Sequence, residues 1–374
     1  MDDLFKIFIQ NRDVKSGTIE LYSQIIKDYS KFLDKTPSEW ISEAESEEEK
    51  DDPPIRMRNR SIKKYLLNYK DHLVERDLSP RTISTRLTVV RFFYSDFNID
   101  LPRSRSKKIV YKEGIEDLPS RDEIKLALSF SNIKYQSVIL LMLSSGMRSS
   151  DIRALKYSDF LTSLKDYIKI PKKRFISVDE VVDLLEETSE IIIPTWRITA
   201  IKTNTKFFTF SSPESLEKII EYLKSEPPKT LNRYLFRSGR YPDKPISSRA
   251  FMGYFNYLNK KCGLGKPYKQ NKLRSHALRK YFGTTLGRVG LQQLTIDRLM
   301  AHKVDAVTDA YIKPDITSLK EQYMQCVEEL SIENVKVKVY EVDSKDKKRL
   351  DSLEKKYEEL LKLHEEKDEY NKLP

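Results

Sequence analysis

The chain has 374 residues, a length typical of two or three domains, and its 33% charged residues with only 10 glycines favour a polar, mainly helical protein. No apolar run approaches the roughly 18–20 residues of a membrane span, and the N-terminus lacks the order of a signal peptide. Two cysteines, without CxxC spacing, exclude a disulfide framework and a cysteine metal site. We therefore expect a soluble, cytoplasmic protein that does not bind a membrane.

The positive charge is concentrated in one part of the chain. Residues 195–320 hold 24 lysines and arginines against 9 aspartates and glutamates, a net charge of +15, whereas the whole chain has +11. A basic block of this size favours a polyanionic partner, most plausibly DNA or RNA. The alternative is a basic surface that serves only solubility.

The first hundred residues predict a helical domain. Residues 16–35 place apolar side chains at helical spacing, and residues 60–76 also read as a helix. The acidic run at 41–54, which ends in two prolines, is typical of a solvated loop or linker.

The next predicted helix begins near Ser79, the expected N-cap, with Pro80 at its first position. Its apolar side chains predict one buried face. Arg81, Thr85 and Arg91 fall on the other face, which suits contact with DNA phosphates but equally suits an ordinary hydrated surface.

A second, larger domain should follow the basic, aperiodic segment at 101–114. Ser120–Glu123 fits a capping box, and residues 135–146 form an apolar helix closed by a glycine. Strand-like runs follow at residues 167–170, 191–201 and 206–210, and residues 247–330 have a helical pattern. The fold class is therefore mainly α with a small β-sheet.

Four short stretches of this second domain carry candidate chemistry, and the first is SSGMRSSD at 144–151. Arg148 lies between a glycine turn and a new helix, which Ser149 or Ser150 would cap. A guanidinium beside free backbone N–H groups suits an anionic oxygen, and Asp151 could hold it in place. Alone the signal is weak, because arginines at helix starts are common.

The other three stretches supply imidazoles, a phenol and lysines. His276 and Arg279 are three residues apart and project from one helix face, although a half-buried histidine beside a surface arginine explains them as well. His302 precedes Tyr311 by nine residues. Lys202 lies at the neck of a predicted hairpin, and Lys206 is its rival on the returning strand.

In order, these residues read Arg–Lys–His-x-x-Arg–His–Tyr: Arg148, Lys202, His276, Arg279, His302 and Tyr311. This order, with its local context, resembles the tyrosine recombinase (phage integrase) family, of the Xer/integrase type. The resemblance covers about residues 115–325 and implies a mixed α/β catalytic domain at 117–330. It also implies a helical core-binding domain at 1–105, a linker at 106–116 and a charged helical tail at 331–374.

The resemblance implies a site-specific recombinase that cleaves and rejoins double-stranded DNA through a 3′-phosphotyrosyl intermediate. Two arginines would hold the phosphate, two histidines would add hydrogen bonds and proton transfer, the tyrosine would attack, and Lys202 would protonate the leaving oxygen. No metal, ATP or other cofactor is expected. The protein would act as a homo-oligomer, a tetramer, on the DNA of a prokaryote or virus, in integration or excision of a mobile element or in resolution of chromosome dimers.

Two other functions stay open on the same fold: a type IB topoisomerase-like enzyme and a DNA-binding protein without catalysis. The pair His276 and Arg279 favours the recombinase, since a lysine is expected at the first position in the topoisomerases.

The sequence departs from the family pattern in three places. Ala301 stands where a glycine is usual, Lys280 stands where a histidine or arginine is common, and the interval from Arg148 to Lys202 is lengthened by a charged stretch at 171–190. The third departure leaves the lysine assignment open among Lys202, Lys206 and Lys172.

After the tyrosine, residues 316–330 form an apolar helical stripe. The family resemblance makes this stripe a candidate for packing on a neighbouring subunit, and packing on its own domain is the equal alternative. Residues 344–372 predict a solvated helix. Their two heptads are fewer than the three or four that would indicate a coiled coil.

Overall fold

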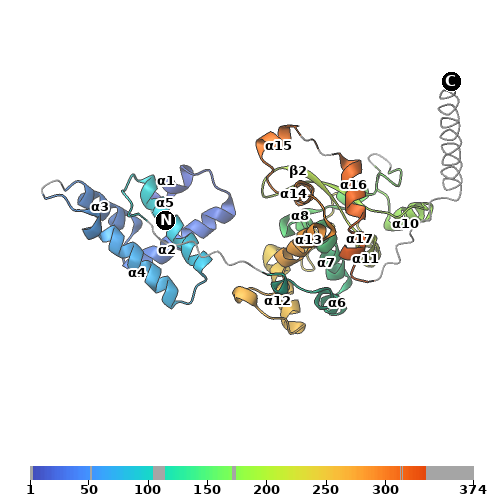
Figure 1. The fold of residues 1–374 in the computed structure, drawn as a ribbon, viewed down its shortest axis with the longest axis horizontal. Helices are drawn as coiled ribbons and strands as arrows, with labels where there is room; N and C mark the ends of the chain where they lie inside the picture. The colour runs from blue at the N-terminus through green and yellow to red at the C-terminus, as the bar shows by residue number, and fades with distance from the viewer. Residues whose placement is uncertain are drawn as a thin grey trace, which may run out of the picture. The chain divides into compact units, whose positions relative to one another are not determined.

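The computed structural model describes residues 3–50, 53–103, 114–170, 174–311, 313 and 315–333. The chain divides into two compact units, a first unit of Met1–Glu113 and a second unit of Gly114–Pro374 (Figure 1). The predicted linker at 106–116 and the predicted tail at 331–374 fall mostly outside the described residues.

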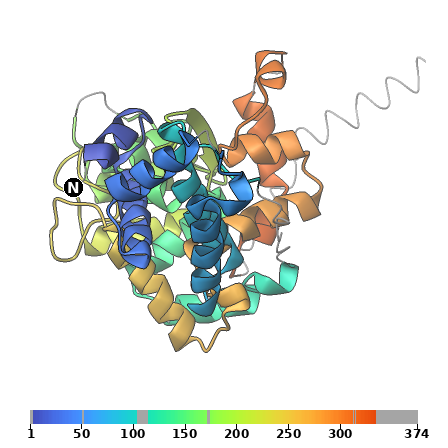
Figure 2. The same ribbon diagram turned by 90° about the vertical axis from the view of Figure 1, so that its left-hand side faces the viewer.

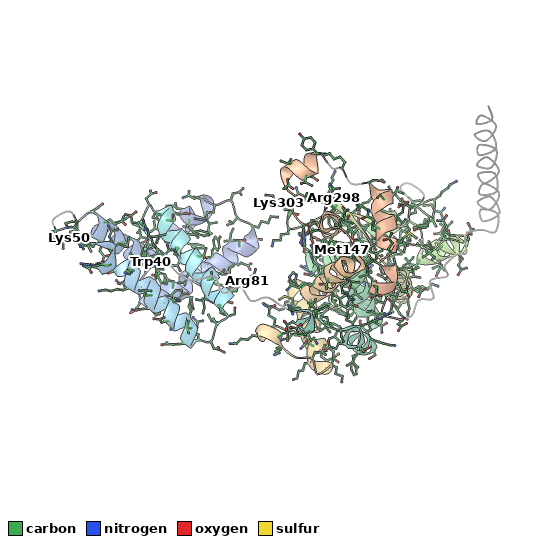
Figure 3. All side chains as sticks on the ribbon, viewed as in Figure 1. Trp40, Lys50, Arg81, Met147, Arg298 and Lys303 are labelled. Atoms are coloured by element: carbon green, nitrogen blue, oxygen red, sulfur yellow. The ribbon has the colours of Figure 1, made fainter. Side chains whose placement is uncertain are left out.

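The first unit is a bundle of helices around an aromatic core. Trp40, Tyr29, Tyr69 and Tyr94 are almost completely buried and stack edge-on, with Trp40 inside the bundle (Figure 3). The predicted cap at Ser79 is confirmed. The helices are α1 Asp3–Gln10, α2 Ser16–Leu33, α3 Pro37–Glu48, η1 Met57–Asn59, α4 Ser61–Glu75 and α5 Pro80–Asp96.

The acidic run at 41–54 is not the loop that its composition predicts, because most of it belongs to α3. The helix begins with a capping box between Thr36 and Glu39, with Pro37 at its first position. Trp40 and Ile41 then lie in the core. The segment is therefore an amphipathic helix with one narrow apolar face, which its high charge alone does not predict.

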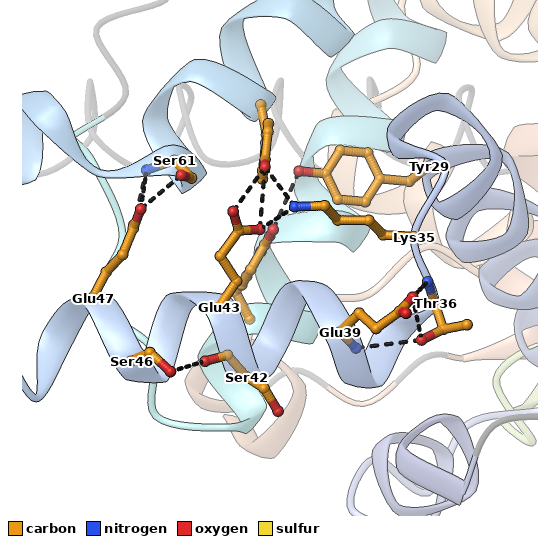
Figure 4. Close-up of polar contacts among 11 residues, drawn as sticks. Tyr29, Lys35, Thr36, Glu39, Ser42, Glu43, Ser46, Glu47 and Ser61 are labelled. Atoms are coloured by element: carbon orange, nitrogen blue, oxygen red, sulfur yellow. Dashed lines mark hydrogen bonds and ion pairs between the residues drawn. The ribbon is translucent and has the colours of Figure 1, made fainter.

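The glutamates of α3 also hold the helix to its neighbours (Figure 4). Glu43 accepts hydrogen bonds from Lys35, at 2.6 Å, and from Tyr65. Glu47 accepts from the main-chain N–H of Ser61, at 2.8 Å, and so caps the start of α4. These carboxylates are structural, which a reading of the run as solvated charge could not anticipate.

The second unit is mainly helical with one two-stranded sheet. Its first elements are η2 Ile115–Asp117, α6 Arg121–Ser129, α7 Ile133–Ser145, α8 Ser149–Ala154, α9 Tyr157–Ser163, α10 Val178–Glu186, β1 Thr195–Thr199 and β2 Lys206–Phe210. The later elements are α11 Pro213–Ser225, α12 Ser248–Lys261, η3 Pro267–Lys269, α13 Ser275–Val289, α14 Gln293–Leu299, α15 Ala306–Tyr311, α16 Ile316–Met324 and α17 Val327–Leu330.

Helix α7 is the centre of the second unit. Its residues from Ser137 to Ser145 are all buried, and α6, α11, α13 and β2 pack around it. It ends at Gly146, whose φ of +62° lies in the left-handed region, as the glycine predicts. A Cβ at this position would lie 2.3 Å from the Phe282 ring on α13.

Replacement of Gly146 by alanine is therefore expected to lower the free energy of unfolding by about 2–4 kcal/mol, from backbone strain and overpacking together. Gly263→Ala is the matched control, because Gly263 also has a positive φ, +65°, but has nothing within 4 Å of the added methyl. Its expected loss is only ~1 kcal/mol, from the backbone alone. Equal losses in urea denaturation of the two variants would contradict the proposed close contact of α7 with α13.

The sheet is the hairpin that the sequence predicts. Strands β1 and β2 are antiparallel, with Thr195 opposite Phe210 and Thr199 opposite Lys206. Asn204 adopts a positive φ of 55° in the turn between them. The run at 167–170 is not a strand; there the Tyr167 hydroxyl bonds with the main chain of Ile193 instead.

The charged stretch at 171–190 contains a helix of its own. A capping box between Ser177 and Glu180 starts α10, and Val178, Val181 and Leu185 are buried on its inner face. The helix packs against α11. The described part of the insertion thus covers the core of the second unit.

The stripe after the candidate tyrosine packs on its own unit. Tyr323, on α16, is fully buried, and its hydroxyl donates to Ser144 O at 2.7 Å. Beyond α17, the buried carboxylate of Glu214 accepts from the main-chain N–H groups of Ile332 and Glu333. Of the two alternatives for residues 316–330, the structure has packing within the chain.

Among the described residues, no helix combines the length and the apolar character needed to cross a membrane.

Candidate active site

Two of the predicted site residues, Arg148 and Arg279, lie close together in the second unit. Arg148 directly precedes α8, so the helix begins at Ser149 and no serine caps it. Arg279 lies on α13 and is 5% exposed. Its guanidinium donates to the main-chain carbonyls of Gly146 and Met300, and that of Arg148 donates to Ala301 O at 2.8 Å. The main chain therefore holds both guanidiniums in place.

This arginine pair concentrates positive charge. Burial, followed by the nearby Arg148 cation, lowers the pKa of Arg279 to about 10, while the carboxylate of Asp151 acts in the opposite direction. Arg279 therefore stays protonated at neutral pH. Arg148 Nη1 and Asp151 Oδ2 are buried and have no hydrogen-bond partner among the described residues. Buried polar atoms are nearly always paired, so these two unpaired atoms are unusual.

The turn after α14 supplies two of the carbonyls that bind the arginines. Ala301 has a φ of +49°, in the left-handed region that a glycine would adopt without strain. This conformation directs Ala301 O to Arg148, while the preceding carbonyl, Met300 O, accepts from Arg279. The departure from glycine at this position therefore leaves the turn intact.

His302 immediately follows this turn and is held by Asp297 of α14. The ring nitrogen Nδ1 lies 2.8 Å from Asp297 Oδ1, and the main-chain N–H of His302 donates to Asp297 O. The same carboxylate oxygen also accepts from Gln293 at 3.0 Å. The imidazole is 43% exposed, so it is accessible to a substrate.

The hairpin that carries Lys202 is attached to α8. The main-chain N–H of Ile201 donates to Asp151 Oδ1 at 3.0 Å, so the residue next to Lys202 is fixed to the helix that follows Arg148. Lys202 is exposed in the turn, and Lys206 is exposed at the start of β2. The third candidate, Lys172, lies outside the described residues.

His276 is the second residue of α13, one turn before Arg279, and it is exposed at the surface. The helix therefore presents the two side chains on neighbouring turns, as their spacing predicts.

Tyr311 is the most exposed of the candidate site residues whose exposed fraction the structure gives. Its side chain is 85% exposed, at the end of α15. That short helix stands clear of the rest of the second unit in both views (Figures 1 and 2). Asp305 caps it by accepting from the N–H of Thr308 at 2.9 Å, and none of its described side chains is buried.

The three candidate DNA contacts in the first unit have different environments. Arg81 is exposed at the start of α5 (Figure 3). The hydroxyl of Thr85 donates to Arg81 O, and the guanidinium of Arg91 is half-buried and donates to Pro102 O at 2.8 Å. Arg81 is therefore the most accessible of the three.

Sequence reasoning missed the groups that position the site. The carbonyls of Met300 and Ala301 leave no pattern in the side chains. Asp297 was visible as an acid five residues before His302, but that signal is too common to interpret without the structure. Within the described ranges, no three histidine, cysteine, aspartate or glutamate side chains are grouped to hold a metal ion.

Residues 114–317 match the model of the phage integrase family, and residues 3–100 match the N-terminal SAM-like domain of phage integrases. The first match alone covers more than half of the chain. The chain belongs to the phage integrase family. Its members are tyrosine recombinases, enzymes that cleave and rejoin DNA, so the predicted family and reaction are confirmed.

Individual members of the phage integrase family are distant from this chain. The tyrosine recombinase XerD of Rickettsia bellii (strain RML369-C) is 22% identical over 272 residues, which are 68% of this chain and 79% of that protein. The Tn1549 transposon integrase, solved in complex with circular intermediate DNA, has a TM-score of 0.50 at 16% identity, over 88% of this chain and 99% of that one. The XerA recombinase has a TM-score of 0.37 at 19% identity, over 86% and 96%. The Tn1549 integrase shares the fold, and the predicted mainly α class is confirmed.

Proposed function

We propose that this integrase family member is a site-specific recombinase in which Tyr311 attacks a DNA phosphodiester held by Arg148 and Arg279. The observation that carries the proposal is the arginine pair: two guanidiniums fixed by backbone carbonyls, one of them with an unpaired buried donor. A phosphodiester bears a negative charge, and its nonbridging oxygens gain more as the nucleophile approaches. Planar, permanently charged forks suit those oxygens.

The proposed cleavage step balances without an external energy source. The phenolic oxygen of Tyr311 forms a bond to phosphorus and loses its proton to a nearby base, for which His276 and His302 are the candidates. The bond from phosphorus to the 5′ oxygen breaks, and Lys202 supplies the proton that this oxygen needs. A 5′ hydroxyl from another strand then reverses the step and rejoins the DNA.

The proposal includes a movement of α15. Tyr311 is 85% exposed, whereas Arg279 is 5% exposed, and the movement would bring the phenol to the phosphate that the arginines hold. DNA is the natural trigger, because it would bring the phosphate and, in the proposed tetramer, neighbouring copies of the chain. The exposed α15 supports a nucleophile that is assembled only on DNA.

Strand joining tests the second half of the proposed reaction. We would cleave a nicked duplex built from the DNA that flanks the gene's own element, so that the short released strand cannot religate, and then add a second duplex with a 5′ hydroxyl. The expected product joins the two duplexes, and an otherwise identical duplex with a 5′ phosphate should give none, because it lacks the attacking group. Cleavage without joining to the second duplex would contradict the recombinase.

A further inference from the structure

Asp297 lies next to His302, and one of its carboxylate oxygens, Oδ1, is bound within the protein. It faces His302 Nδ1 at 2.8 Å, Gln293 Nε2 at 3.0 Å and, through its main chain, the N–H of His302. The side chain and backbone of one residue thus bind the ring and the main chain of the same histidine. That double attachment limits how the imidazole can rotate.

A neutral imidazole has one N–H donor and one acceptor, and the partner of one nitrogen determines which tautomer is present. An ionised carboxylate only accepts hydrogen bonds, so it selects the form in which Nδ1 carries the proton. Nε2 is then the ring nitrogen left to meet the substrate.

We propose that Asp297 is a positioning residue, which fixes the ring and tautomer of His302 and so leaves the unprotonated Nε2 as the nitrogen that accepts a proton in the cleavage step. The role of His302 in that step rests on the proposed function, whereas the tautomer does not. Ala301 connects the two parts, because its carbonyl binds Arg148 while the next residue carries the fixed imidazole.

Nuclear magnetic resonance of the ring nitrogens tests the tautomer directly. In the full chain labelled with 15N-histidine, only four histidines contribute, and His302→Gln identifies the signal of His302. We expect the neutral ring to be protonated at Nδ1 in the wild type and to lose that preference in Asp297→Asn, whose amide can donate to Nδ1 as well as accept from it. A wild-type ring protonated at Nε2, or a tautomer unchanged in Asp297→Asn, would overturn the proposal.

A second experiment tests the role of Asp297 in the reaction, by measuring the rate at which the covalent protein–DNA complex forms at saturating DNA. Asp297→Asn should lower this rate by about 10–100-fold, the range typical of groups that orient a catalytic histidine from behind. Asp183→Asn, an exposed carboxylate on α10, makes the same change in charge and should react at the wild-type rate. If the wild type reacts and Asp297→Asn is equally fast, the positioning role is wrong and the proposed function stands. If the wild type itself forms no covalent complex, the proposed function fails, and the tautomer measurement still decides the Asp297 contact.

Discussion

Arg148→Lys is expected to slow the cleavage of bound DNA by about 10³-fold, the cost typical of removing a preorganised donor from a developing oxyanion. Lysine keeps the positive charge but loses the planar fork. Its three donors lie on one nitrogen, so it cannot occupy both the position of Nη2, which donates to Ala301 O, and that of Nη1. The single-turnover rate at saturating DNA measures this loss apart from any change in affinity.

Arg153→Lys is the matched control for this substitution. Arg153 lies five residues further along, in α8, is partly buried and donates to Ile246 O at 3.1 Å. The chemical change is identical, but the side chain is directed at another part of the fold. We expect Arg153→Lys to retain the cleavage rate within a few-fold, with thermal melting to confirm that both variants fold. Similar rates for the two variants would show that the fork of Arg148 does not hold the phosphate.

The parts of the site that sequence could predict are those set by one helix or one turn. His276 and Arg279 share a helix face because residues three apart on a helix always do. Gly146 terminates α7 because glycine adopts the left-handed conformation without cost. The hairpin at Lys202 followed from two strand-like runs and a polar turn.

The position of Tyr311 could not be predicted in this way. Its spacing from His302 fits a family pattern, but spacing does not say whether α15 packs on the unit or stands away from it. The described residues of α15 offer no buried apolar side chain that would fix it to the core. The local sequence of α15 therefore does not encode its position.

The two errors in the predicted secondary structure of the first unit have a similar cause. The run at 41–54 was interpreted by its charge, although Trp40 and Ile41 were enough to bury one face of a helix. Helix α1 was not predicted, although Phe5 and Phe8 are buried in it. In α3, a few aromatic and apolar anchors outweigh the polar composition of the segment.

Covalent trapping on a nicked duplex tests the central claim most directly: that Tyr311 is the nucleophile. The wild type should form a protein–DNA band that survives denaturant and disappears with protease, and Tyr311→Phe should form none, because it lacks the phenolic oxygen. Tyr241→Phe, which removes another exposed phenol, is the control and should form the band at the wild-type level. A band with Tyr311→Phe would place the nucleophile elsewhere. The absence of a band with wild-type protein that is demonstrably bound to the DNA would contradict the account as a whole.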